Sequence, residues 1–490
     1  MSKRTYRISL LQLAPDRNSK VPLYLQLYES LRTQIVTGML RQGQRLPSSR
    51  TVAAELRISR NMISKAFELL LTEGYVVGKV GSGTYVADLP ETFLHARAAA
   101  ESQVESGPSR IEGIPTFELT SQHSRELDAN SIRPFRETAE LDLFPYKTWQ
   151  TLTNETYKEF ERLKRVEPDA SGLQELRENI SIFLRYSRGV RCEADQIVLT
   201  SGFQQAIVLC AYALLRKSRT AWMEDPGCVA TRNAFTAFDA TVYPVPVDMD
   251  GVDFEYAKKA YPTPDVLYLS PAHQYPVGGT LSQHKRNALL SWAADNNVWI
   301  IEDDISGLLR YEGHPLPSLQ GQDNRGRVIY IGSFNPVLPP TFGLAYMVLP
   351  NRTIAHQFSA LKNVFDKTTR LVDQSILSKF LSSGQFERHL RHMRLLYKDR
   401  RDVMMNAAGR ELKGKLELQY QPAGMHLVGW LPHHFDDKEI SLRLHRKGIV
   451  APALSDYTMK FKRPPALLLA FAGFHKFRIA NYLQRMHGIL

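Results

Sequence analysis

The chain has 490 residues, of which 43% are hydrophobic and 23% charged, a composition typical of a globular protein of two or three domains. Its 62 lysines and arginines exceed its 50 acidic residues by 12, which favours a polyanionic partner. Three scattered cysteines argue against a disulfide framework or a zinc site. We find neither a secretion signal nor an apolar run long enough to cross a bilayer, so we expect a soluble cytoplasmic protein without a membrane partner.

The basic excess is concentrated near the N-terminus. Residues 1–90 hold thirteen lysines and arginines against six acidic residues. Within this stretch, apolar side chains recur at helical spacing from Tyr24 to Ile35 and predict an amphipathic first helix that ends near Gly38. The charge and the first helix therefore belong to the same basic N-terminal domain.

Two further helices and a hairpin are predicted after it. The second helix begins near Pro47, with Ser48 or Ser49 as its N-cap, and the third follows the N-cap Ser59. Residues 75–77 and 84–86 flank a glycine-rich tip and predict a β-hairpin. Two short helices joined by a tight turn and followed by a hairpin make up a winged helix-turn-helix.

Three segments, LPSSR, SRN and GSGTYV, resemble the GntR-type winged helix in their order and spacing. We assign residues 1–88 to this DNA-binding domain. The resemblance implies that the start of the third helix enters the major groove of a double-stranded DNA operator. A solvated helix face is the alternative for any single arginine. The implied DNA contacts are Arg50, Ser59, Arg60, Asn61, Ser64, Lys65, Lys79, Gly81 and Ser82.

A second domain is predicted beyond a polar linker, residues 89–130. From residue 131 to 490, helical patterns alternate with short apolar runs at 196–199, 220–223, 266–269, 298–301 and 328–331. This alternation predicts an α/β fold with a mostly parallel sheet. Because ligands of open α/β sheets bind at the carboxyl ends of the strands, we expect the loops that follow these runs to line one pocket.

The motifs DLFPYKTW, LTSGFQQA, MEDPG, SPAHQYPVG, IEDDI and YIGSF resemble, in order, the fold-type I aminotransferase domain. With the winged helix ahead of them, the whole chain resembles the MocR-type regulators of the GntR family. The resemblance implies a domain over residues 131–490, with a small subdomain at roughly 390–490. It also implies a site for pyridoxal 5′-phosphate at the carboxyl ends of the strands.

Two cations of that site are missing when the motifs are aligned. Pro336 stands at the position of the Schiff-base lysine, and Gly343 at that of the arginine that binds the cofactor phosphate. The resemblance also places Ile305 and Cys228 where the family has tyrosines. No lysine occurs between Lys285 and Lys362, so a small shift of register does not supply the amine. Since proline has no primary amine, we expect no covalent cofactor and no catalytic residue.

Part of the pocket remains. Asp303 matches the carboxylate that pairs with the pyridinium nitrogen, and Ser201, Gly202 and Phe203 match the turn that holds the phosphate; structural capping roles are the alternative. Loss of the arginine removes a charge-assisted contact of ~1.5–3 kcal/mol, so any residual non-covalent binding of pyridoxal 5′-phosphate should be weak. The residual pocket is predicted to comprise Ser201, Gly202, Phe203, Cys228, His273, Tyr275, Asp303, Ile305, Ser333 and Pro336.

These observations predict a transcription regulator rather than an enzyme. We expect a homodimer that binds an operator through two winged helices and an unknown small-molecule effector through the vacated pocket. Two alternatives remain open: a pyridoxal-phosphate aminotransferase with a DNA-binding appendage, and an aminotransferase-like scaffold that only dimerises. A visible aldimine absorption band separates the first alternative from the regulator, and stabilisation by a ligand separates the second.

Overall fold

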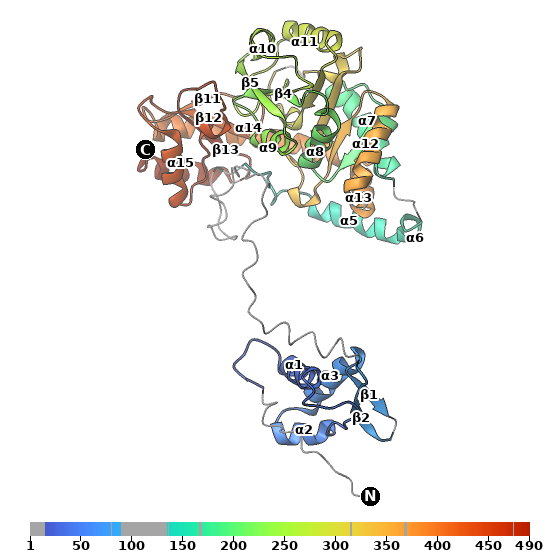
Figure 1. Cartoon of the computed structure of the whole chain (residues 1–490). Helices are drawn as coiled ribbons and strands as arrows, with labels where there is room; N and C mark the ends of the chain where they lie inside the picture. Colours follow the sequence, from blue (N-terminus) through green and yellow to red (C-terminus); the bar gives the residue numbers. More distant parts are fainter. Residues whose placement is uncertain are drawn as a thin grey trace, which may run out of the picture. The chain divides into compact units, whose positions relative to one another are not determined.

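The computed structural model describes residues 15–79, 81–89, 135, 137–165, 169–313, 316–366, 370–473 and 475–490. The chain divides into two compact units, residues 1–114 and 115–490, and each is described by itself (Figure 1). Apart from Leu89, the predicted linker lies outside the described residues. The predicted domain limits at residues 88, 130 and 390 stay predictions.

The N-terminal unit is a winged helix-turn-helix, as the sequence predicted. Its helices α1 and α3 pack through side chains that are almost fully buried, among them Leu27, Leu31 and Ile63. The strands of the wing pair antiparallel, with Val76 opposite Val86. Its elements are α1 (Leu23–Val36), α2 (Ser49–Leu56), α3 (Arg60–Thr72), β1 (Val76–Lys79) and β2 (Gly83–Val86).

The two helix caps of the helix-turn-helix differ. Ser48 caps α2, because its hydroxyl accepts a hydrogen bond from the Thr51 amide at 3.1 Å, whereas Ser49 is the first helical residue. Helix α2 ends at Arg57 in the left-handed conformation, with φ of 53°, which turns the chain toward α3. Ser59 precedes α3 as predicted, but its side chain forms no capping hydrogen bond.

The C-terminal unit is built on an eight-stranded sheet in the order β3-β10-β9-β8-β7-β4-β5-β6. Neighbours from β9 to β5 are parallel, and β10 and β6 pair antiparallel with their neighbours, so the predicted mostly parallel sheet is confirmed. The strands are β3 (Ile197–Thr200), β4 (Thr220–Asp225), β5 (Thr241–Asp248), β6 (Gly251–Val252), β7 (Val266–Leu269), β8 (Trp299–Asp303), β9 (Val328–Ser333) and β10 (Ala345–Val348).

Helices cover both faces of this sheet. Residues of α8, α9 and α12 share a core cluster with one set of strand side chains, and residues of α7, α10, α11 and α13 share clusters with the opposite set. The helices are α5 (Tyr146–Lys158), α6 (Phe160–Leu163), α7 (Gln174–Arg188), α8 (Phe203–Leu214), α9 (Val229–Ala237), α10 (Phe254–Ala260), α11 (Gln283–Asp295), α12 (Arg352–Phe365) and α13 (Leu371–Ser382).

A long helix, α14 (Gln385–Glu411), connects this layered body to a smaller subdomain. The subdomain contains the antiparallel strands β11 (Glu417–Gln419), β12 (His426–Trp430) and β13 (Ala466–Ala470), with α15 (Asp437–Arg446) and α16 (Ile479–His487) (Figure 1). No helix in the described part of the chain is long and apolar enough to cross a membrane.

One buried ion pair ties α7 to the end of β8. Arg188, the last residue of α7, donates from Nε and Nη2 to the two carboxylate oxygens of Asp304 at 2.6 and 2.9 Å. The Tyr330 hydroxyl donates to the same carboxylate at 2.7 Å. Because both charged side chains are almost completely buried, each depends on the other for its stability in the folded state.

We predict that Asp304→Ala lowers the free energy of unfolding of the C-terminal unit by about 3–5 kcal/mol, since it leaves the Arg188 guanidinium buried and unpaired. Urea denaturation followed by tryptophan fluorescence measures this unit alone, because all five tryptophans lie in it. The paired replacement Arg188→Met with Asp304→Leu buries no charge and should cost less. A loss below about 1 kcal/mol in Asp304→Ala would contradict the role of the pair.

Candidate functional site

Most of the residues predicted to contact DNA lie on the surface of the N-terminal unit. Arg50 on α2 and Arg60, Asn61 and Lys65 on α3 are exposed, and Ser64 is half-buried. The Arg60 Nε reaches the Ser49 hydroxyl at 3.4 Å, which brings the N-terminal turns of α2 and α3 together. The exposed Ser59 hydroxyl, free of a capping bond, lies at the same end of α3.

Aromatic rings hold two of the predicted lysines. The Lys65 ammonium lies 4.0 Å from the centre of the Tyr24 ring, and the Lys79 ammonium lies 5.1 Å from that of Tyr85. At the tip of the wing, the hydroxyls of Ser82 and Tyr85 are 2.6 Å apart, and Gly81 adopts a positive φ of 72°. Both lysines are therefore positioned before any partner binds.

Sequence reasoning missed Arg45 in this region. Arg45 is exposed, and its backbone forms an antiparallel β-bridge with that of Tyr85 in the wing. The Arg45 Nε lies 3.0 Å from the position that a Cβ on Gly83 would take. A glycine at position 83 therefore leaves room for the guanidinium. The signal in the sequence was the basic residue directly before LPSSR.

The predicted pocket residues come largely from the carboxyl ends of neighbouring strands. Ser201, Gly202 and Phe203 (hereafter the cup turn) connect β3 to α8, while Asp303 ends β8 and Ser333 ends β9. The register places Ala345 of β10 opposite both Thr200 and Ser333, so the cup turn and Ser333 lie at the ends of the two strands that flank β10. Gly202 has φ of 120° with open space where a side chain would stand.

Asp303 is satisfied by the protein itself. The Tyr268 hydroxyl donates to its carboxylate, and the Ile305 amide donates at 3.0 Å, so Ile305 contributes through its backbone. Burial raises the pKa of the Asp303 carboxyl to about 6, which leaves it ionised at neutral pH. Burial also raises the pKa of the nearby Cys228 thiol, which disfavours the reactive thiolate.

The loop after β7 faces the small subdomain. His273 is buried, with its Nε2 2.6 Å from the position of a Cβ on Gly424. Burial lowers the pKa of the imidazole to about 3, so it is neutral at physiological pH. The Tyr275 ring packs edge-on against His426 and Tyr457, with centroids 5.4 and 5.7 Å apart.

Pro336 lies inside the protein core. Its carbonyl accepts a hydrogen bond from the Tyr397 hydroxyl at 3.3 Å, and the next two residues, Val337 and Leu338, belong to the largest core cluster. The His389 ring of α14 lies 2.6 Å from the Val337 carbonyl. Pro336 and the two residues after it are therefore packed in the core, and the carbonyls of Pro336 and Val337 are hydrogen-bonded to α14.

The structure also brings Asp366 and Arg370, which sequence reasoning missed, to the cup turn. The Ser201 hydroxyl donates to an Asp366 carboxylate oxygen at 3.1 Å. The Arg370 Nη1 lies 3.3 Å from the position of a Cβ on Gly343. Neither residue stands in a motif, and both are more than 160 positions from the cup turn along the chain, so no local pattern in the sequence indicated them.

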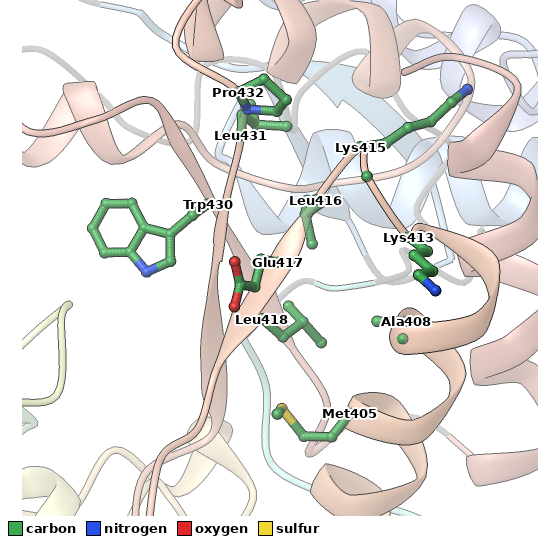
Figure 2. Close-up of a pocket in the computed structure, with 12 residues that line it drawn as sticks. Met405, Ala408, Lys413, Lys415, Leu416, Glu417, Leu418, Trp430, Leu431 and Pro432 are labelled. Carbon is green, nitrogen blue, oxygen red and sulfur yellow. The ribbon is translucent and has the colours of Figure 1, made fainter.

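A separate cavity of about 530 Å³ lies in the small subdomain, between α14 and the strands β11 and β12. Figure 2 shows Met405 and Ala408 on the helix side and Leu418 on the strand, with Leu416 just before that strand and Lys413 near the end of the helix. None of the predicted pocket residues lines it. Its position therefore separates it from the strand-end site.

The comparisons with known proteins agree with this architecture. Residues 23–86 match the family described as "Bacterial regulatory proteins, gntR family", and residues 151–476 match "Aminotransferase class I and II". The chain is 32% identical to the "Probable rhizopine catabolism regulatory protein MocR" of Rhizobium meliloti, over 94% of this chain and 92% of that protein. It is 29% identical to the "HTH-type pyridoxine biosynthesis transcriptional regulator PdxR" of Corynebacterium glutamicum, over 81% of each.

Solved structures give the same result for the C-terminal unit. The kynurenine aminotransferase of Pyrococcus horikoshii aligns with a TM-score of 0.67 and 25% identity, over 73% of this chain and 90% of that one. An archaeal alanine:glyoxylate aminotransferase aligns with a TM-score of 0.67 and 26% identity, over 76% and 92%. The protein is thus a GntR-type DNA-binding regulator fused to a fold-type I aminotransferase-like unit. Within that class, the chain belongs to the MocR-type regulators.

We predict that Arg60→Ala weakens binding to the operator by about 1–3 kcal/mol and reduces discrimination against mismatched sites, because Arg60 is the first residue of α3, the helix expected to enter the major groove. Fluorescence anisotropy with operator and scrambled duplexes at fixed salt measures both effects. Lys447→Ala removes an exposed charge from the C-terminal unit and is the matched control. Equal losses in the two variants would show that Arg60 contributes only charge.

Proposed function

We propose that this MocR-type regulator has lost aldimine chemistry and that its aminotransferase-like unit binds a small effector and dimerises. The observation that carries the proposal is the buried Pro336 at the aligned lysine position. Proline has no primary amine, so it cannot condense with an aldehyde. The flanking lysines in the sequence, Lys285 and Lys362, lie on α11 and α12, outside this segment.

The residues present do not fit pyridoxal 5′-phosphate. The aldehyde has no amine at position 336, and the phosphate has no arginine at position 343. Gly343 adopts φ of 55°, a left-handed conformation that disfavours any side chain, and Arg370 already occupies the adjoining space. An arginine at position 343 would strain the backbone and would have to displace Arg370. We therefore derive no reaction through the cofactor.

For the N-terminal unit, we propose that Arg50, Arg60 and Asn61 contact bases or backbone in the major groove and that Ser59 and Ser64 add contacts from the same end of α3. Lys65, Lys79, Gly81 and Ser82 would contact phosphates. The exposure of all these residues except the half-buried Ser64, and the hydrogen bond between Arg60 and Ser49, support the assignment. Arg45, at the base of the wing, is an additional candidate.

An effector would act by binding one arrangement of the dimer more tightly than another, because a ligand that binds both equally shifts nothing. The strand-end pocket is the proposed site. The space above Gly202 and the loop that carries His273 and Tyr275 support this choice. The aminotransferase alternative requires an amine that the aligned segment lacks.

We predict that protein incubated with excess pyridoxal 5′-phosphate, then desalted, shows no aldimine absorption band. Borohydride reduction followed by peptide mapping should find no stoichiometrically modified lysine, because position 336 offers no amine. The archaeal alanine:glyoxylate aminotransferase serves as the positive control. A stoichiometric adduct at one lysine, such as Lys362, would contradict the proposal and restore the enzymatic alternative.

The dimer and the operator can be tested together. We expect sedimentation velocity to show a dimer and footprinting to show two protected half-sites in palindromic or direct repeat, since each protomer supplies one winged helix. A compound that stabilises the C-terminal unit should also change operator affinity. Protection of one half-site by a monomer, or stabilising ligands that leave operator affinity unchanged, would contradict the proposal.

A further inference from the structure

The cup turn is engaged by side chains from the region between α12 and α13. Ser201 donates from its hydroxyl to Asp366 Oδ2 at 3.1 Å. The Gln205 side-chain amide reaches the same oxygen at 3.4 Å, and its Oε1 accepts from the Ser201 amide at 2.8 Å. A carboxylate of the chain is therefore bound by two polar groups at the start of α8.

Arg370 lies near the same turn, beside Gly343. Its Nη1 donates to the Phe342 carbonyl at 3.3 Å and lies equally close to the position of a Cβ on Gly343. That position is 3.6 Å from the Ser201 carbonyl oxygen. A guanidinium from α13's N-cap thus stands beside the place where the aligned family has its phosphate-binding arginine.

We propose that the cup turn of this chain is self-occupied: the Asp366 carboxylate takes the place of a ligand phosphate, with Arg370 as the cation of the same turn. A phosphate brought to Ser201 would meet a fixed negative charge and would have to displace it. The strand-end pocket consequently accepts effectors without a phosphate group. This inference rests on the proposed effector role of the pocket. It restricts the effector to compounds that carry no phosphate group.

The geometry explains why the two residues matter together. If Asp366 alone were present, the turn would simply repel anions. With Arg370 beside Gly343, removal of the carboxylate leaves a hydroxyl, the Gln205 amide and a cation at one turn, a combination suited to phosphate. The proposal therefore predicts that a latent anion site is uncovered when Asp366 is neutralised.

The test uses the full-length protein, with inorganic phosphate and then pyridoxal 5′-phosphate as probes, measured by calorimetric titration and by the thermal midpoint from tryptophan fluorescence. We expect Asp366→Asn, and Asp366→Ser as a second variant, to bind inorganic phosphate at least about tenfold more tightly than wild type. Adding Arg370→Ala to either variant should abolish the gain. Asp295→Asn neutralises an exposed carboxylate that pairs with Arg325 and should behave as wild type.

Two results would overturn the inference: equal phosphate binding by wild type and Asp366→Asn, or no gain in both Asp366 variants while they remain folded. A gain that survives Arg370→Ala would remove Arg370 from the proposal. Inorganic phosphate has no aldehyde, so its binding is independent of aldimine formation. Failure here is therefore distinguishable from failure of the proposed function, which the borohydride mapping and the operator measurements test.

Discussion

Hydrogen bonds from α14 to the loops that follow β8 and β9 are the constraint on which the site depends. His389, Arg394 and Tyr397 of this helix bond to the backbone carbonyls of Val337, Leu308 and Pro336, in segments after β9 and β8. Backbone carbonyls buried without donors are costly, so these bonds fix the loops in one conformation. Pro336 is thereby made part of the structural core that joins the sheet to α14.

Two of the residues predicted to line the pocket have partners within the protein. The Asp303 carboxylate accepts hydrogen bonds from the Tyr268 hydroxyl and the Ile305 amide, and the Ser201 hydroxyl donates to the Asp366 carboxylate. A buried carboxylate with two donors is stable without a pyridinium nitrogen. The presence of Asp303 is therefore explained by folding as readily as by binding, so the proposed loss of aldimine chemistry is supported by Pro336 and Gly343 and not by Asp303.

The sequence predicted the winged helix and five strands because each depends on a local pattern: helical spacing with a serine cap, or a short apolar run between helices. It did not predict β5, whose Pro244 and Pro246 conceal a strand near the sheet edge, nor β10, which runs antiparallel between β3 and β9. It predicted a cap bond at Ser59 that does not form. Asp366 and Arg370 reach the cup turn only through the packing of α12 and α13, which no local motif encodes.

The charge of Asp303 bears on how an aminotransferase-like unit could serve a regulator. If positions 336 and 343 lack the lysine and the arginine of the family site, as we propose, Asp303 has neither of those cations beside it. Keeping an ionised Asp303 buried then requires donors from the protein, and Tyr268 and the Ile305 amide supply them. These donors would keep Asp303 stable under the proposed loss of the cofactor. The occupancy of the proposed pocket would then vary with the concentration of the effector, which is the property that a ligand-responsive switch requires.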